Sequence, residues 1–402
     1  MSATVIVSAV RTPIGSIGGI LKDINPERLI AVAMEAVIGR AGIEKEIIDE
    51  VIIGQAKQST DAPNIARVAS LIIGLPEHIP GYTVHRQCAS GMQAILSGML
   101  QIETGMSEVV LVGGVESMST APFYIRGARF GVGNGTTQFL DPNTESQPRS
   151  QPAEIYGSFN MIQTADEVAR RYGISREKQD AFALQSQRRA IAAIDEGRFA
   201  EEIVPCSIPR RKQEPLIFDT DEYPRRDTNA EKLARLRPIF EGGTVTAGNA
   251  SGRNDGASAM VLMSEKKAEA LGLCPIARVI NGAAAGVDPR VMGLGPVAAI
   301  EKLEISLAKE GITRSDIDLF EINEAFAAQS LACAEILGLD GEKLNVNGGA
   351  IALGHPLGCS GTRISTTLIH EMKRRGVRYG VASLCVAGGL GMAMAFENLR
   401  TE

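Results

Sequence analysis

Cys88 is the residue of this chain best placed to act as a nucleophile. It lies in segment 87–92, after an extended run at 82–85 and before a helical run at 92–102. A helix N-terminus offers free backbone N–H groups and a positive dipole end, and both lower the pKa of a thiol. A thiolate there is a good nucleophile with donors beside it for an oxyanion. The alternative is a buried structural cysteine, the commoner fate of an isolated Cys.

His355 is the candidate base for such a thiol. It stands within a glycine-dense segment, 347–361, and is followed by Pro356. Glycines this dense mark tight turns or a close approach of the backbone to a ligand. Histidine is the side chain best suited to take a thiol proton near neutral pH. The alternatives are a histidine satisfied within its loop and a phosphate-binding loop, although the Gly-Lys-Ser/Thr of a P-loop is absent.

Two further segments place polar or reactive residues where an expected strand ends. In segment 321–328, Asn323 and Glu324 precede an apolar helical run, and polar residues at strand ends are well placed for a site in α/β folds. The alternative for Asn323 is ordinary helix N-capping. In segment 383–391, Cys385 ends a strand and meets glycines, so it is either a second acid/base or a thiol of the core.

The elements that must position these residues alternate between strands and helices. Apolar runs at 4–8, 51–54 and 108–114 predict strands buried on both faces. Residues 26–41 have the apolar spacing of a helix. The pattern predicts an α/β fold.

The chain also repeats itself. Residues 41–51 match residues 310–320 at an offset of 269, and Ser90-Gly91 matches Ser360-Gly361 at an offset of 270. Each Ser-Gly pair opens a helical segment, and the strand that follows ends in a double glycine. Two matches at nearly one offset predict two similarly folded halves. Chance is the alternative, because a helix followed by a strand is common in α/β chains.

A segment of different composition separates the halves. It is rich in Gly, Pro, Asn and Gln at 131–153 and helical and charged at 165–199, which predicts loops and helices laid over the core. Strand character returns at 244–263. The predicted division is an N-terminal half at 1–118 plus 249–272, a loop domain at 119–248 and a C-terminal half at 273–402.

Composition narrows the class of protein. With 402 residues, 44% hydrophobic and 22% charged, the chain is long enough for a globular core of normal size. A net charge of −6 without a clustered basic face argues against nucleic-acid binding. The six cysteines form no CxxC pair, which favours reduced thiols and argues against zinc. No targeting segment and no apolar stretch of ~20 residues is evident, so we expect a cytoplasmic enzyme without membrane insertion.

Taken together, the four segments resemble the thiolase family. That family carries a nucleophilic Cys in C-x-S-G, an N-E-A-F block, a G-H-P-x-G-x-S-G block and a C-terminal C-x-G-G block, and the order and spacing agree here. Segments 7–15 and 244–252 agree as well, so the resemblance spans nearly the whole chain. It implies two duplicated βαβαβαββ halves in a five-layer α-β-α-β-α arrangement, with a loop domain inserted in the first half.

The resemblance also implies a mechanism. Cys88 is the expected nucleophile, His355 its base and Cys385 the second acid/base, in ping-pong acyl transfer. One expected oxyanion hole is His355 with a water held by Asn323, and the other is the backbone N–H groups of Cys88 and Ala387. CoA is a substrate, and neither a metal nor a redox cofactor is expected. The residues that resemble CoA or acyl contacts are Ser251, Ala247, Arg225, Met161, Met292 and Phe326, although plain core packing is an alternative for Met292.

Four positions depart from the family pattern. His85 stands where Asn is usual, Asn160 where His is common, Arg253 where an apolar residue is usual, and Ala387 where the first Gly of C-x-G-G stands. No departure removes a catalytic group, and the effect expected of them is on the identity of the acyl group.

The leading hypothesis is a thiolase for acetoacetyl-CoA or longer 3-oxoacyl-CoA thioesters, acting in either direction as a homodimer or homotetramer, as the family does. The alternatives are a thiolase for an unusual acyl group, a condensing enzyme of the ketoacyl-synthase kind and a non-catalytic CoA-binding subunit. Ketoacyl synthases usually have His in place of Cys385, so this cysteine argues against them. A non-catalytic subunit has no need of Cys88, Asn323, His355 and Cys385 together.

Overall fold

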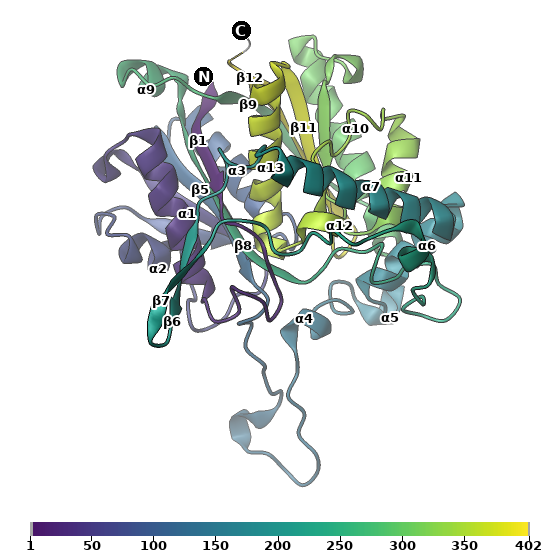
Figure 1. The fold of residues 1–402 in the computed structure, drawn as a ribbon. Helices are drawn as coiled ribbons and strands as arrows, with labels where there is room; N and C mark the ends of the chain where they lie inside the picture. Colours follow the sequence, from purple (N-terminus) through teal and green to yellow (C-terminus); the bar gives the residue numbers. More distant parts are fainter. Residues whose placement is uncertain (1–2, 401–402) are drawn as a thin grey trace.

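The computed structural model describes residues 3–400 and is built around one sheet (Figure 1). The strands are β1 (Thr4–Arg11), β2 (Gly15–Ser16), β3 (Glu50–Gly54), β4 (Gly81–Val84), β5 (Val109–Ser117), β6 (Cys206–Arg210), β7 (Gln213–Phe218), β8 (Asn254–Ser264), β9 (Ala277–Gly286), β10 (Leu319–Ile322), β11 (Tyr379–Val386) and β12 (Leu390–Asn398). The main sheet has the order β10-β11-β12-β9-β1-β8-β5-β3-β4, β2 pairs with β8, and β6 and β7 form a separate hairpin.

Helices cover the outer faces of this sheet and also lie between its two halves. They are α1 (Pro26–Ala41), α2 (Ile65–Ile72), α3 (Ser90–Glu103), α4 (Pro142–Glu145), α5 (Ala153–Tyr156), α6 (Met161–Tyr172), α7 (Arg176–Asp195), α8 (Ala230–Ala234), α9 (Glu265–Ala270), α10 (Gly295–Leu307), α11 (Ala327–Leu337), α12 (Ala350–Leu353) and α13 (Leu357–Arg375), with 3-10 turns at Lys45–Ile47, Ala128–Phe130, Pro289–Leu294, Ala308–Glu310 and Arg314–Asp316. The predicted helix at 26–41 is confirmed. Pro26 opens α1, where a missing N–H costs nothing, and Gly42 ends it in the left-handed conformation.

The strand pairing confirms the predicted duplication. In the first half, β3 pairs parallel with β5, which pairs antiparallel with β8, which pairs antiparallel with β1. In the second half, β10, β11, β12 and β9 follow one another with the same order and the same senses. A short antiparallel pairing of β1 with β9 joins the two halves.

Alternation along the strands produces the five predicted layers. In β8, Val261 and Met263 belong to the apolar cluster shared with α1 and α2, whereas Met260 and Leu262 belong to the central cluster. That central cluster collects the inner faces of both half-sheets around α3 and α13. A third cluster places α10 and α11 on the outer face of the second half. Figure 1 shows α13 in the middle, with α1 and α2 to one side and α10 and α11 to the other.

Glycines allow the two central helices to touch through their backbones. A Cβ added to Gly91 in α3 would lie 2.5 Å from Oγ1 of Thr362 in α13. A Cβ added to Gly361 in α13 would collide with the backbone nitrogen of Met92 in α3. The first turns of α3 and α13 are therefore held against each other, which brings together the loops that precede them.

The segment between β5 and β8 carries α4 to α8 and the β6–β7 hairpin. Its residues 121–140 project away from the body (Figure 1). The strand predicted at 244–263 is wrong in its first part, because β8 begins only at Asn254. Before it, Asp166 accepts hydrogen bonds from the N–H groups of Thr244 and Val245, and Asn249 accepts one from Thr246. Side chains thus satisfy backbone groups that a strand would pair.

No helix among residues 3–400 is long and apolar enough to cross a membrane.

The close contact between α3 and α13 predicts that adding one methyl group at Gly361 destabilises the fold. We expect Gly361→Ala to lower the free energy of unfolding by ~1–3 kcal/mol, because an overpacked core must shift its backbone. Gly39→Ala is the matched control, since Gly39 is exposed within α1 and has nothing within 4 Å of an added Cβ. The control should raise stability by up to ~1 kcal/mol through helix propensity. Urea unfolding of both variants checks this, and equal effects of the two would contradict it.

Candidate active site

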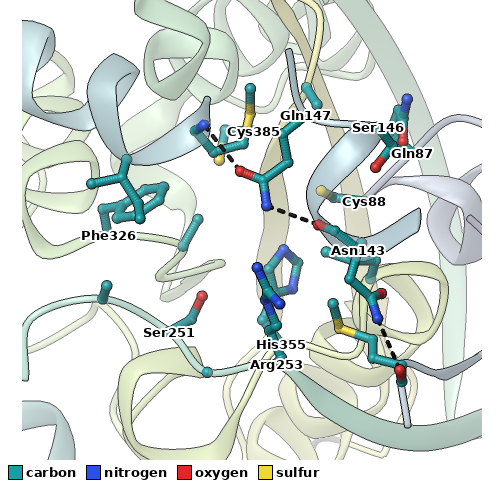
Figure 2. Close-up of a pocket in the computed structure, with 18 of the residues that line it drawn as sticks. Gln87, Cys88, Asn143, Ser146, Gln147, Ser251, Arg253, Phe326, His355 and Cys385 are labelled. Carbon is teal, nitrogen blue, oxygen red and sulfur yellow. Dashed lines mark hydrogen bonds between the residues drawn. The ribbon is translucent and has the colours of Figure 1, made fainter. Parts of the chain in front are cut away.

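The residues singled out from the sequence converge on one cavity of about 360 Å³. Cys88, His355, Cys385 and Ala387 line it, and Asn323 is buried behind, within reach of His355. Figure 2 shows the sulfurs of Cys88 and Cys385 facing the same space above the His355 ring. The site therefore draws on both halves of the fold.

Cys88 is presented by a tight connection from β4 to α3. Ala89 is the N-cap of α3, so the thiol stands just before the first turn, as predicted. Gln87 takes a left-handed φ of 48°, and Ser90 fixes this loop by accepting a hydrogen bond from the Arg86 N–H and donating one to the Gln87 carbonyl. A left-handed residue other than glycine costs roughly 1–2 kcal/mol, so the surrounding contacts hold the nucleophile in this turn.

The prediction of a lowered thiol pKa is wrong for the free protein. Burial raises the pKa of Cys88 to about 11, against the opposing effects of the Ala387 N–H, the Lys57 ammonium and the N–H of Cys88 itself. Burial disfavours the charged thiolate more than these groups favour it. The thiol is therefore protonated at neutral pH and needs a base. The two N–H groups are the pair expected to form an oxyanion hole.

His355 is held as a neutral imidazole. Burial, followed by the nearby charge of Arg363, lowers its pKa to about 3. Its Nδ1 lies 2.6 Å from Oγ of Ser360, and that hydroxyl donates its own hydrogen to the Pro356 carbonyl at 3.0 Å. Nδ1 therefore carries the proton and donates to Ser360, which leaves Nε2 with a free lone pair. A neutral ring with an unprotonated Nε2 is the form that can accept a thiol proton.

Asn323 supports the imidazole and does not cap a helix. It follows β10, and the next helix, α11, begins at Ala327 with Phe326 as its N-cap, so the capping alternative is excluded. Its Nδ2 lies 3.5 Å from both ring nitrogens of His355. Its Oδ1 is buried and has no hydrogen-bond partner among residues 3–400. An unpaired buried acceptor beside the base is suited to hold a water or a substrate group.

Cys385 is the second thiol of the cavity. It lies near the end of β11, and its pKa is raised well above the ordinary value by burial first and then by its proximity to Cys88. The turn after β11 contains Gly388 and Gly389 with φ values of 90° and 79°, a conformation that favours glycine. This turn directs the N–H of Ala387 toward the Cys88 sulfur.

The candidate substrate contacts also line the cavity, all six of them: Ser251, Ala247, Arg225, Met161, Met292 and Phe326. Ser251 is fixed by donating its N–H to the Ala325 carbonyl. Met292 and Phe326 pack with Cys385 in one apolar cluster, so Met292 both packs and lines the cavity.

The four departures from the family pattern have different places. His85 is exposed and is not among the residues lining the cavity. Asn160 caps α6 in a capping box with Gln163, which gives it a structural role. Arg253 and Ala387 both line the cavity, and Arg253 lies 3.6 Å from Asp141.

Sequence reasoning missed part of the cavity wall. The missed residues include Lys57, Gln87, Asn143, Ser146, Gln147 and Tyr223. Gln87 is the neighbour of the nucleophile, and Lys57 follows the end of β3, so the rule that polar residues at strand ends mark sites could have found both. Asn143, Ser146 and Gln147 lie in and beside the short helix α4, whose composition carries no such signal.

The raised thiol pKa predicts how Cys88 reacts with iodoacetamide. The alkylation rate of the free protein should keep rising as the pH is raised above neutrality, because thiolate forms only toward a pKa of about 11. Mass spectrometry of the peptide containing Cys88 measures this, with the exposed Cys274 as an internal comparison. A rate that levels off at or below neutral pH would reveal a preformed thiolate and contradict the prediction.

Comparison with known proteins agrees with this geometry. The family model for the thiolase N-terminal domain matches residues 4–266, and that for the thiolase C-terminal domain matches residues 273–398. An acetyl-CoA acetyltransferase of Cupriavidus necator is 47% identical over 99% of this chain and 100% of its own length. The crystal structure of the Bacillus anthracis acetyl-CoA acetyltransferase has a TM-score of 0.95 at 48% identity, covering 99% of both chains. Human mitochondrial 3-ketoacyl-CoA thiolase in complex with CoA has a TM-score of 0.92 at 42% identity, covering 99% of this chain and 98% of its own. This chain therefore belongs to the thiolase family of acyltransferase enzymes.

Proposed function

We propose that this protein cleaves 3-oxoacyl-CoA thioesters with CoA, giving acetyl-CoA and a shortened acyl-CoA, and also catalyses the reverse condensation. The observation that carries the proposal is the meeting of Cys88, a neutral His355 and Cys385 in one cavity, with the Ala387 N–H directed at the Cys88 sulfur. Two thiols and one imidazole are the groups that a cleavage with one covalent intermediate and one carbanion requires.

The first half-reaction breaks the bond between C2 and C3 of the substrate. His355 Nε2 takes the Cys88 proton while the sulfur bonds to C3, and the N–H groups of Cys88 and Ala387 stabilise the oxyanion at C3. The electron pair of the broken bond passes to C2 and the thioester oxygen of the departing acetyl-CoA enolate. Asn323, through a water, and the protonated His355 stabilise that oxygen, and Cys385 protonates C2.

The second half-reaction releases the acyl group that remains on Cys88. Cys385, left as a thiolate by the first half-reaction, takes the proton of a second CoA thiol while that sulfur attacks the acyl carbon. The bond to the Cys88 sulfur breaks, and the protonated His355 returns its proton to Cys88. Ser251, Ala247 and Arg225 are proposed to contact CoA, with Met161, Met292 and Phe326 around the acyl group. CoA is a substrate in this scheme, and no metal or redox cofactor takes part.

The setting of the reaction is also part of the proposal. All six cysteines are free, which supports a reducing compartment such as the cytoplasm. A homodimer or homotetramer is proposed by resemblance to the family, and the exposed apolar side chains on residues 121–140, including Phe130, support contacts between copies. The division into two halves and a loop domain, with boundaries at 118, 248 and 272, remains a prediction.

The proposed function predicts cleavage of acetoacetyl-CoA. Purified protein with acetoacetyl-CoA and CoA should form acetyl-CoA, and Cys88→Ser should abolish the reaction. His355→Asn should lower kcat by ~10²–10⁴, the usual contribution of a positioned base. An inactive wild type whose Cys88 is still alkylated would point to another acyl group. An inactive wild type with an inert Cys88 would favour a non-catalytic subunit.

Cys385 predicts a separation of the two half-reactions. Cys385→Ala should lose cleavage of acetoacetyl-CoA, because the enolate has no proton donor. It should retain exchange of labelled CoA into acetyl-CoA, because exchange needs only Cys88 and His355. Cys274→Ala, a change at an exposed thiol, is the control for both assays. Equal loss of cleavage and exchange in Cys385→Ala would contradict the assigned role.

A further inference from the structure

Lys57 brings an unmatched positive charge to the wall of the cavity. Its side chain lines the cavity, and its Nζ donates to the Pro142 carbonyl at 3.1 Å and to the hydroxyl of Ser146. No carboxylate lies within 4.0 Å of it in the part of the chain that the structure describes. A half-buried ammonium held by two neutral oxygens lacks the counter-ion that such a group normally has.

The nearest acidic candidate does not supply this counter-ion. Glu116 is buried, and both of its oxygens accept backbone hydrogen bonds, from the N–H groups of Ala56, Lys57 and Gly358. That carboxylate is therefore committed to holding the loop after β3 and the start of α13. Two other cations line the cavity. Arg253 already has Asp141 at 3.6 Å and the Thr144 hydroxyl at 3.3 Å, and Arg225 lies over the Tyr223 ring at 5.3 Å. Among residues 3–400, Lys57 is therefore a cation of this wall with neither a carboxylate nor an aromatic ring as its partner.

Unused hydrogen-bond donors surround this charge. Ser146 accepts from Lys57 but donates its own hydroxyl hydrogen to no described residue. The Gln87 amide, also on the cavity wall, has no hydrogen-bond partner of its own in residues 3–400. An apolar acyl chain would leave all of these groups unsatisfied, at a cost for each one.

The polar wall lies on the side of the cavity that carries the nucleophile. Figure 2 shows Gln87, Ser146 and Asn143 on the same side of the cavity as Cys88, and Ser251 and Phe326, a proposed CoA contact and a proposed acyl contact, on the opposite side. Lys57 is also close enough to Cys88 for each to shift the pKa of the other. An acyl group bonded to the Cys88 sulfur would therefore have Lys57 within the space that it can enter.

We propose that the preferred substrate is a 3-oxoacyl-CoA whose acyl chain ends in a carboxylate, which pairs with Lys57 and accepts a hydrogen bond from Ser146. This inference rests on the proposed function and names its substrate class. The reaction is unchanged: the C2–C3 bond breaks, acetyl-CoA leaves, and CoA takes the acyl group from Cys88. With a six-carbon diacid, the products are acetyl-CoA and succinyl-CoA.

The test compares substrates that differ only at the far end of the chain. The kcat/KM for 3-oxoadipyl-CoA is measured against that for 3-oxohexanoyl-CoA, and a second pair, 3-oxopimeloyl-CoA and 3-oxoheptanoyl-CoA, covers a chain one methylene longer. The wild type should prefer the diacid in at least one pair. A charge-assisted contact predicts a preference of about 10- to 100-fold.

Variants then assign the preference to Lys57. Lys57→Met should lower the diacid-to-monoacid ratio by about 10- to 100-fold, and Lys57→Arg should keep most of it. The ratio cancels any effect that the lost charge has on Cys88, because both substrates use the same nucleophile. Arg253→Met is the matched control, a cation of the same wall that already has a partner, and should change the ratio less.

The outcomes separate the two proposals. A wild type that cleaves the monoacids as well as or better than the diacids in both pairs overturns this inference, whether or not the variants fold. An unchanged ratio in Lys57→Met overturns it as well. Cleavage of acetoacetyl-CoA without cleavage of either diacid supports the proposed function and refutes only the preference for a terminal carboxylate. No cleavage of any of the five thioesters refutes both proposals.

Discussion

The contact between the backbones of α3 and α13 is the constraint on which the rest of the structure depends. Both helices are buried between half-sheets, and glycine at 91 and 361 lets them approach until a methyl group would collide. Each helix is preceded by a loop that carries one reactive group, Cys88 in one half and His355 in the other. The distance between nucleophile and base is thus set by helix packing, which is rigid, and not by the loops themselves.

Burial determines the charge state of both Cys88 and His355. The same loss of water raises the pKa of Cys88 and lowers that of His355, so both are neutral before substrate arrives. Charge then develops only during attack, when the N–H of Ala387 is already directed at the sulfur. Donors fixed in advance stabilise such charge without having to reorganise. Lys57 lies beside this pair, and burial lowers the pKa of its ammonium while the charges of Glu116 and Cys88 oppose that effect.

Most of the fold and the central residues of the site could be predicted from the sequence, because they leave local patterns in it. Helix α1 was predictable because Pro26 and the glycine after Ala41 act locally. The duplication was predictable because the repeated helix and strand packing leaves a repeated apolar pattern. The direction of the Cys88 pKa was not, since it depends on burial by distant elements. Lys57 was also missed, because its importance comes from having no carboxylate within 4.0 Å among residues 3–400, which only the fold can show.

The duplication has a consequence for how the two halves share the chemistry. At the offset of 270 that relates Ser90 to Ser360, position 85 corresponds to 355, and both hold histidine, while Cys88 corresponds to Gly358. The two serines act alike, since each hydroxyl donates a hydrogen bond to a backbone carbonyl just before its helix, that of Gln87 for Ser90 and that of Pro356 for Ser360. The active site is thus an approximate two-fold arrangement whose two copies differ in their side chains and in where the helix begins, at Ser90 in α3 and at Leu357 in α13. The first turn has a thiol at Cys88, and its histidine, His85, is exposed. The second turn has a buried histidine, His355, and glycine in place of the thiol, because a Cβ at Gly358 would collide with the Val115 carbonyl.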